Sequence, residues 1–128
     1  MSEAVLDSSA VLAVILREPG QEEIGSFLPG ALLSTVNLAE VVGKLLDGGA
    51  TEAEARRMIG GLDLIVVPFD PEDAWATGLL RTSSRDAGLS LGDRACLALA
   101  FSRRLPAITT DRAWSRLGLG AAVRVVGR

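Results

Sequence analysis

The chain has 128 residues, of which 48% are hydrophobic and 23% are charged, and its formal net charge is −3. This composition is typical of a globular protein and excludes a disordered chain, and the length predicts one domain spanning residues 1–128. The sequence contains no histidine, which excludes Ser-His-Asp and Cys-His catalytic groups and zinc sites built from histidine and cysteine.

Short apolar stretches alternate with longer amphipathic ones along the whole chain, separated by Gly, Pro and helix-capping residues. The predicted strands cover residues 4–6, 32–34, 64–67, 107–109 and 123–126. The predicted helices cover residues 9–17, 21–28, 36–47, 51–60, 71–87, 89–104 and 113–117. This alternation predicts an α/β fold with three layers, α/β/α, around a mainly parallel central sheet.

Targeting signals are absent from this pattern. No apolar run approaches the ~18 residues of a membrane span, since Arg17 and Glu18 end the first one. The beginning of the chain lacks the basic start and apolar core of a signal peptide. The single cysteine, Cys96, fits a reducing compartment. We therefore expect a cytoplasmic protein that does not contact a membrane.

Four acidic residues lie where predicted strands end or helices begin. They are Asp7 in VLDSSAVLA, Glu40 in STVNLAEVV, Asp93 in LSLGDRACLALA and Asp111 in ITTD. Each has a purely structural interpretation, because Asp7 and Asp111 suit the caps of the following helices, while Asp93 and Glu40 suit capping boxes with Ser90 and Asn37. Taken singly, capping is the better interpretation of each acid.

Taken together, the four acids indicate a site. The turns that follow parallel strands open at one edge of a sheet, so Asp7 and Asp111 share that edge, and the first helical turns carrying Glu40 and Asp93 face it. Four carboxylates in one cleft repel each other, and a divalent cation relieves that repulsion. An all-oxygen ligand set suits Mg²⁺ or Mn²⁺.

Charge is divided unevenly along the sequence. Residues 1–78 contain 13 acids and 4 bases, whereas residues 79–128 contain 3 acids and 9 arginines. A basic second half around an acidic pocket could bind a phosphate backbone, although solvated arginines on helix surfaces are an equally good interpretation of charge alone. Lys44, the only lysine, lies in VVGKLL and does not belong to a phosphate-binding loop.

In these motifs, their order and their spacing, the chain resembles the PIN-domain ribonucleases, in particular the VapC-type toxins of toxin–antitoxin pairs. The resemblance spans essentially the whole chain and implies a PIN-like fold. It implies that Asp7, Glu40, Asp93 and Asp111 hold Mg²⁺ or Mn²⁺ for hydrolysis of RNA, with the hydroxyls of Ser8 and Thr110 supporting the site. It also implies a homodimer and a small inhibitory antitoxin. Three arginines close to the acids are candidate contacts to RNA phosphate: Arg94, Arg112 and Arg116.

Three other interpretations remain open. A phosphatase or a phospho-acceptor receiver domain is disfavoured, because Asp7 is followed by Ser8-Ser9 instead of a D-x-D motif and Lys44 lies in the wrong part of the chain. A non-catalytic interaction module would use the acids only as caps. A PIN-domain nuclease for RNA processing would lack an antitoxin.

Overall fold

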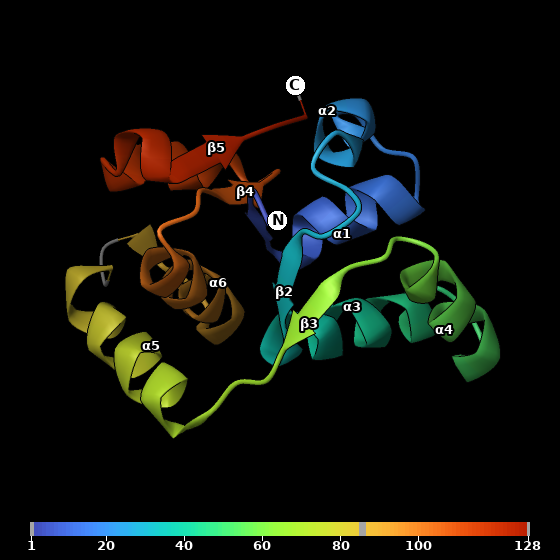
Figure 1. Cartoon of the computed structure of the whole chain (residues 1–128), viewed down its shortest axis with the longest axis horizontal. Helices are drawn as coiled ribbons and strands as arrows, with labels where there is room; N and C mark the ends of the chain where they lie inside the picture. Colours follow the sequence, from blue (N-terminus) through green and yellow to red (C-terminus); the bar gives the residue numbers. More distant parts are fainter. Residues whose placement is uncertain (1, 85–86, 128) are drawn as a thin grey trace.

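The computed structural model describes residues 2–84 and 87–127. Within these residues, five strands are connected by six α-helices, which follow the first three strands in pairs (Figure 1). The strands are β1 (Val5–Leu6), β2 (Leu32–Ser34), β3 (Ile65–Val67), β4 (Ala107–Thr109) and β5 (Val123–Val125). The helices are α1 (Ser8–Ile15), α2 (Gln21–Gly25), α3 (Thr35–Asp47), α4 (Glu52–Gly60), α5 (Pro71–Ser83) and α6 (Leu91–Arg103). Two 3-10 helices follow β4, η2 (Arg112–Leu117) and η3 (Gly120–Ala122).

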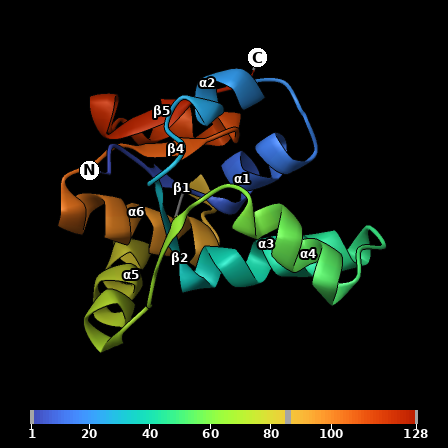
Figure 2. The same cartoon turned by 45° about the vertical axis from the view of Figure 1, so that its right-hand side comes forward.

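The strands form one sheet in the order β3-β2-β1-β4-β5, and every neighbouring pair is parallel (Figure 2). The predicted parallel α/β fold is therefore confirmed. The strand order also separates this fold from receiver domains, whose order is 2-1-3-4-5. From β1 the chain first builds outward through β2 and β3 and then returns to place β4 on the other side of β1. The junction between β1 and β4 is consequently the switch point, where open α/β sheets bind ligands.

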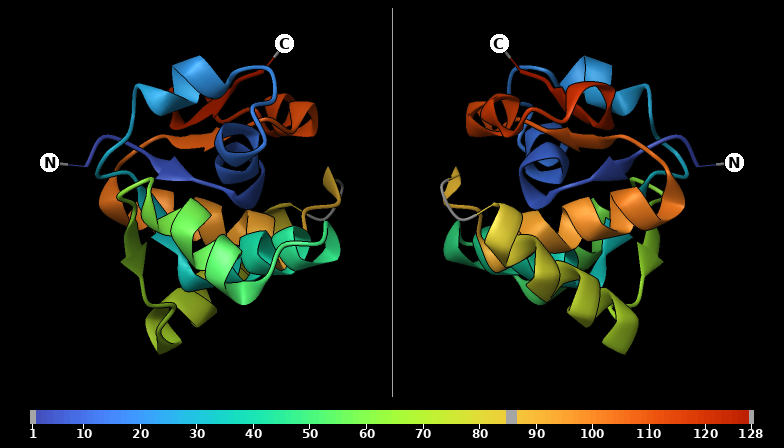
Figure 3. Two further views of the ribbon diagram at one scale, coloured as in Figure 1. Left: turned by 90° about the vertical axis from the view of Figure 1, so that its right-hand side faces the viewer. Right: turned by 90° about the vertical axis from the view of Figure 1, so that its left-hand side faces the viewer.

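Alternate residues of each buried strand supply two separate hydrophobic clusters, one on each face of the sheet. Leu6, Leu33 and Ile108 face a cluster completed by α1 to α4. Val5, Leu32 and Ala107 face a second cluster completed by α6, Leu80 of α5 and Trp114 of η2. Figure 3 shows the helices packed on the two sides of the strands, as expected for a three-layer domain.

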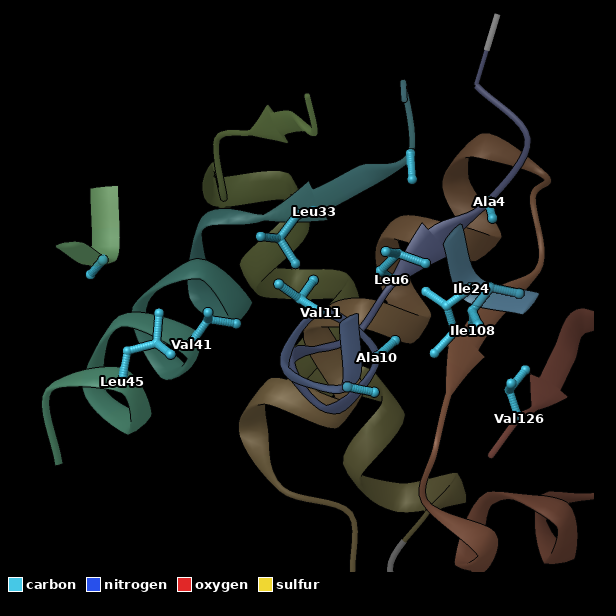
Figure 4. Close-up of a cluster of buried hydrophobic side chains, with 13 residues drawn as sticks. Ala4, Leu6, Ala10, Val11, Ile24, Leu33, Val41, Leu45, Ile108 and Val126 are labelled. Carbon is cyan, nitrogen blue, oxygen red and sulfur yellow. The ribbon is translucent and has the colours of Figure 1, made fainter. Parts of the chain in front are cut away.

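The first cluster holds α1 in place against the centre of the sheet. Val11 and Ile24 are fully buried, and Figure 4 shows Leu33 of β2 beside Val11 and Ile108 of β4 beside Ile24. Full burial of an aliphatic side chain contributes roughly 1.5–3 kcal/mol. These contacts fix the start of α1, and therefore Asp7, relative to the carboxyl ends of β2 and β4.

Most differences between predicted and observed elements lie at their ends, and the segment after β4 differs in type, because it forms two 3-10 helices of which only the first was predicted, as a helix. The helix predicted over residues 21–28 ends at Gly25, four residues before Pro29. The helix predicted over residues 71–87 ends at Ser83, and part of the remaining segment lies outside the described residues. The helix predicted near residues 113–117 is a 3-10 helix. No helix in the described part of the chain is long and apolar enough to cross a membrane.

Candidate metal and active site

Asp7 lies at the switch point, directly after β1, and is 3% exposed. Its Oδ1 accepts hydrogen bonds from the backbone N–H of Ala10, at 2.8 Å, and from the hydroxyl of Ser9, at 2.7 Å. Its Oδ2 accepts a hydrogen bond from the hydroxyl of Thr109, at 2.5 Å. Burial raises the pKa of Asp7 to about 6; these hydrogen bonds oppose the rise, and the charge of Asp93 adds to it.

The Thr109 hydroxyl links Asp7 to the segment that carries Asp111. Thr109 is the last residue of β4 and is fully buried. Its hydroxyl accepts a hydrogen bond from the backbone N–H of Asp111, at 3.0 Å. Asp111 is exposed and caps η2 through the N–H of Ala113. One hydroxyl therefore connects the acids at the ends of the two strands that form the switch point.

A second hydrogen-bonded unit joins Glu40 of α3 to the start of α6. The side-chain amide of Asn37 donates to Glu40 Oε1, at 2.9 Å, and to the carbonyl of Gly92, at 3.0 Å. Both partners are acceptors, which fixes the orientation of the amide and leaves Asn37 Oδ1 buried without a partner. The link brings Glu40 beside the backbone that carries Asp93.

Gly92 is required for this close approach. A Cβ atom at this position would overlap the carboxylate of Glu40. The Glu40 carboxylate can therefore take this position against the backbone of α6 only because residue 92 has no side chain. Packing against Glu40 therefore explains why α6 has a glycine, Gly92, in its first turn.

Asp93 is half-buried between the other acids. It forms the predicted capping box with Ser90, accepting from the Ser90 N–H at 3.0 Å. Burial raises the pKa of Asp93, its hydrogen bonds with Ser90 oppose that rise, and the charges of Asp111 and Glu40 add to it. Asp93 therefore lies within electrostatic reach of all three of the other acids, because its own charge also raises the pKa of Asp7.

The structure thus brings the four acids to one edge of the sheet while each also makes a local hydrogen bond. Oxygen is the only ligand type they offer, which suits a hard divalent cation. Among the described residues, no three acidic side chains are arranged in this conformation to hold one ion together. The chemistry of the donor set therefore fits Mg²⁺ or Mn²⁺, and the acidic side chains would have to come closer together to close around one ion.

Two predictions about supporting residues need correction. The hydroxyls that contact Asp7 belong to Ser9 and Thr109, and not to their neighbours Ser8 and Thr110. Thr110 contributes through its backbone N–H, which donates to Ser9 Oγ at 3.0 Å. In the structure, the second serine of the Ser8-Ser9 pair and the first threonine of the Thr109-Thr110 pair turn toward Asp7.

Arg94 is also differently placed from the prediction that it contacts RNA. Its side chain is 8% exposed, and its guanidinium donates to the backbone carbonyl of Thr77 in α5, at 3.1 Å. It joins α5 to α6 inside the protein and does not offer its charge to a substrate. Arg112 and Arg116 lie on the exposed surface of η2 and remain candidates.

Cys96 lies one turn beyond Asp93 but takes no part in the site. It is fully buried, and burial among the nearby acids Asp7, Asp93 and Glu40 raises the pKa of its thiol well above the ordinary value. A thiol in this environment is a packing group and not a nucleophile.

The fold and this edge define a class of protein: a parallel α/β domain with an acidic cluster at the switch point of its sheet. Residues 4–119 match the family model of the PIN domain, and the chain therefore belongs to the PIN-domain family.

Within the PIN-domain family, the chain is similar to VapC proteins and to chains of VapBC complexes. The chain is 27% identical to Ribonuclease VapC5 of Mycobacterium tuberculosis (strain ATCC 25618 / H37Rv), over 95% of this chain and 93% of that protein. A solved structure of VapBC-5 from Mycobacterium tuberculosis, a member of the VapBC family of toxin-antitoxin systems, covers 100% of both chains at 25% identity with a TM-score of 0.66. The DNA-bound VapBC structure from Salmonella typhimurium shares the fold, with a TM-score of 0.74, 21% identity and 98% of each chain covered. The predicted resemblance to VapC-type PIN domains is confirmed.

Proposed function

We propose that this protein is a metal-dependent endoribonuclease and the toxin of a type II toxin–antitoxin pair. The observation that carries the proposal is the convergence of Asp7, Glu40, Asp93 and Asp111 at the switch point of the sheet, with the pKa values of Asp7 and Asp93 raised by burial and by the charges of the neighbouring acids. Membership of the PIN-domain family and the likeness to Ribonuclease VapC5 support it. Its proposed location is the cytoplasm.

In this proposal the four carboxylates hold Mg²⁺ or Mn²⁺. A bound divalent ion supplies charge stabilisation of the phosphate and makes its water more acidic. The chain's own residues orient that site: Thr109 and Ser9 hold the Asp7 carboxylate, and Asn37 holds Glu40. With no histidine in the sequence, a carboxylate is the available group to accept a proton from the attacking water.

Cleavage of total cellular RNA by the purified protein tests this directly. Discrete fragments in Mg²⁺ or Mn²⁺ that disappear with EDTA and with Asp93→Asn are the expected result. Asp63→Asn is the matched control, because Asp63 is an exposed acid that precedes β3 and lies at the opposite end of the strands from the four acids. A folded, antitoxin-free protein that cleaves no RNA in either metal would contradict the proposal. If Mn²⁺ also failed to raise its melting temperature, the non-catalytic module would be favoured.

An antitoxin partner is proposed from the relatives solved as toxin-antitoxin complexes. An apolar groove of about 510 Å³ is open between α3, α4 and β3, lined by Leu38, Val42, Ile59 and Val66 among others. A groove of this kind suits the apolar face of a short helix. We propose that the antitoxin binds in this groove between α3, α4 and β3. Val42→Asp should therefore abolish co-purification with a co-expressed cognate antitoxin and leave RNA cleavage intact. If the pair stays intact, the antitoxin binds elsewhere.

A homodimer is also proposed, through the outer face of α5. Trp75 and Leu79 are 71% and 69% exposed, one turn apart on that face, beside a shallow hollow at Ala74 and Gly78. Exposed apolar surface of this kind marks an interaction site. Acids at the start of α5 and Arg81 in its last turn favour antiparallel pairing with a second copy, which places opposite charges near each other. Light scattering should show a dimer that Trp75→Glu converts to a monomer, whereas a monomeric wild-type protein would rule the interface out.

A further inference from the structure

A groove next to the acidic cluster contains one cation that the proposed chemistry does not use. The groove has a volume of about 370 Å³ and runs between α1 and α3, where it is lined by Ser8, Ser9, Leu12, Glu40, Gly43, Lys44 and Asp47. Ser9 contacts Asp7, and Glu40 is itself one of the four acids. The groove therefore opens directly from the site.

Lys44 is exposed at the surface of this groove, one helical turn beyond Glu40. Four residues of α-helix rise by about 6 Å, which places the ammonium group within reach of a phosphate adjacent to one held at Glu40. Within residues 2–84 and 87–127, Lys44 makes no ion pair, although Asp47 lies one turn further along the same helix. Its charge is therefore available to a ligand in the groove.

The sheet topology places Lys44 on the opposite side of Asp7 from Arg112 and Arg116. The helix α3 follows β2, and η2 follows β4, and these two strands lie on opposite sides of β1. Lys44 on α3 and the pair Arg112 and Arg116 on η2 consequently flank Asp7 from opposite sides. A strand of RNA lying across the edge of the sheet would meet a cation on each side of the acids.

Two arginines of the second half, Arg94 and Arg124, are already engaged in contacts within the protein. Arg94 is buried against Thr77. Arg124 forms an ion pair with Glu23 and lies over the ring of Phe27. The groove is otherwise acidic, with Glu40 and Asp47 on its wall, so a polyanion would be repelled there without a compensating charge.

We infer that Lys44 is a substrate-positioning residue, which binds an RNA phosphate next to the scissile one and holds the strand in the groove between α1 and α3. The inference rests on the proposed function, because it assumes an RNA substrate at the four acids. Lys44 acts in this role through binding and orientation, and takes no part in the chemical step.

Binding of a short fluorescein-labelled single-stranded RNA, measured at several salt concentrations, tests the inference. Replacing Lys44 by Met should weaken binding roughly three- to tenfold at low salt and reduce the slope of log Kd against log salt by about 0.7, the value for one phosphate contact on a single strand. Lys44→Arg should restore the slope. Arg57→Met, on the exposed surface of α4, is the matched control and should leave the slope unchanged.

Cleavage kinetics distinguish the possible failures. Lys44→Met should raise KM by a similar factor and leave kcat and the melting temperature unchanged. Wild-type protein that cleaves RNA, together with a Lys44→Met variant of unaltered slope and KM, would overturn the role of Lys44 alone. Wild-type protein that neither binds nor cleaves RNA would overturn the proposed function first, and the inference with it.

Discussion

Asp7→Asn should make the metal-free protein more stable at neutral pH, although it removes a proposed metal ligand. Asp7 is 3% exposed, and its pKa is raised from 3.8 to about 6 in the folded state. The folded protein therefore binds a proton more tightly than the unfolded chain. Stability falls as pH rises through the window from about 4 to above 6, because the carboxylate must ionise in a buried position.

The magnitude follows from the size of the shift. A rise of about two pKa units corresponds to a penalty on the order of 3 kcal/mol, fully present at pH 7 and almost absent near pH 4. Asparagine is neutral at every pH and avoids this penalty. Its shape matches that of aspartate, so no cavity is formed and the cap to Ala10 is retained.

The hydrogen bonds around residue 7 can adjust to an amide. Asn Oδ1 can still accept from Ala10 and Ser9, while Nδ2 donates to Thr109 Oγ1. The Thr109 hydroxyl then turns its hydrogen toward Ser9 Oγ, which lies 3.2 Å away. Each protein donor around residue 7 keeps an acceptor, but the second Nδ2–H of asparagine gains none among these contacts. The gain should therefore fall below the full penalty, to on the order of 2 kcal/mol at pH 7.

Urea unfolding in EDTA, repeated from pH 4 to pH 8, measures the effect. The difference between Asp7→Asn and wild type should be close to zero near pH 4 and grow with pH until it levels off above pH 6. Asp47→Asn, an exposed substitution, should stay within about 0.5 kcal/mol of wild type throughout. Added Mn²⁺ should stabilise wild type more than Asp7→Asn. Asp7→Asn as stable as wild type at pH 7, with the same dependence on pH, would refute the reasoning.

Two further substitutions test the hydrogen-bonded units of the site. Gly92→Ala should displace the Glu40 carboxylate and reduce RNA cleavage at least tenfold. The free energy of unfolding measured in urea should change by less than about 1 kcal/mol, because alanine favours the helix. Unchanged cleavage would show that Glu40 is dispensable. Thr109→Val removes the donor to Asp7 and should lower the free energy of unfolding by about 1–3 kcal/mol, whereas Thr110→Val should have a smaller effect; equal losses from the two variants would contradict the assignment of Thr109.

Much of the fold could be predicted because its signals are local. Strands 32–34 and 107–109 were predicted with the correct ends, and the capping box expected at Ser90 is present at the start of α6. Helix ends were less predictable. The end of α2 at Gly25 and the 3-10 geometry of η2 depend on tertiary packing, which periodicity does not encode.

The supporting residues of the site were harder to predict than the acids. Acids at strand ends stand out in sequence, whereas choosing between Thr109 and Thr110 requires knowing which way the end of β4 turns. Asn37 was considered only as a cap, but its position three residues before Glu40 places both on one helical face, and this signal could have identified the contact. The role of Gly92 depends on contact between α3 and α6, which no local pattern reveals.

Capping and metal binding need not be alternative roles for the four acids. Oδ1 of Asp111 and Oδ2 of Asp93 each accept one backbone hydrogen bond, which leaves the other oxygen of each carboxylate free of a protein donor among the described residues. Such caps fix the position of each acid and neutralise none of its charge. The raised pKa values of Asp7 and Asp93 show that repulsion among the acids adds to the cost of burial. A cation that draws the free oxygens together would relieve that repulsion, so the same contacts that start the helices also prepare the site to bind metal.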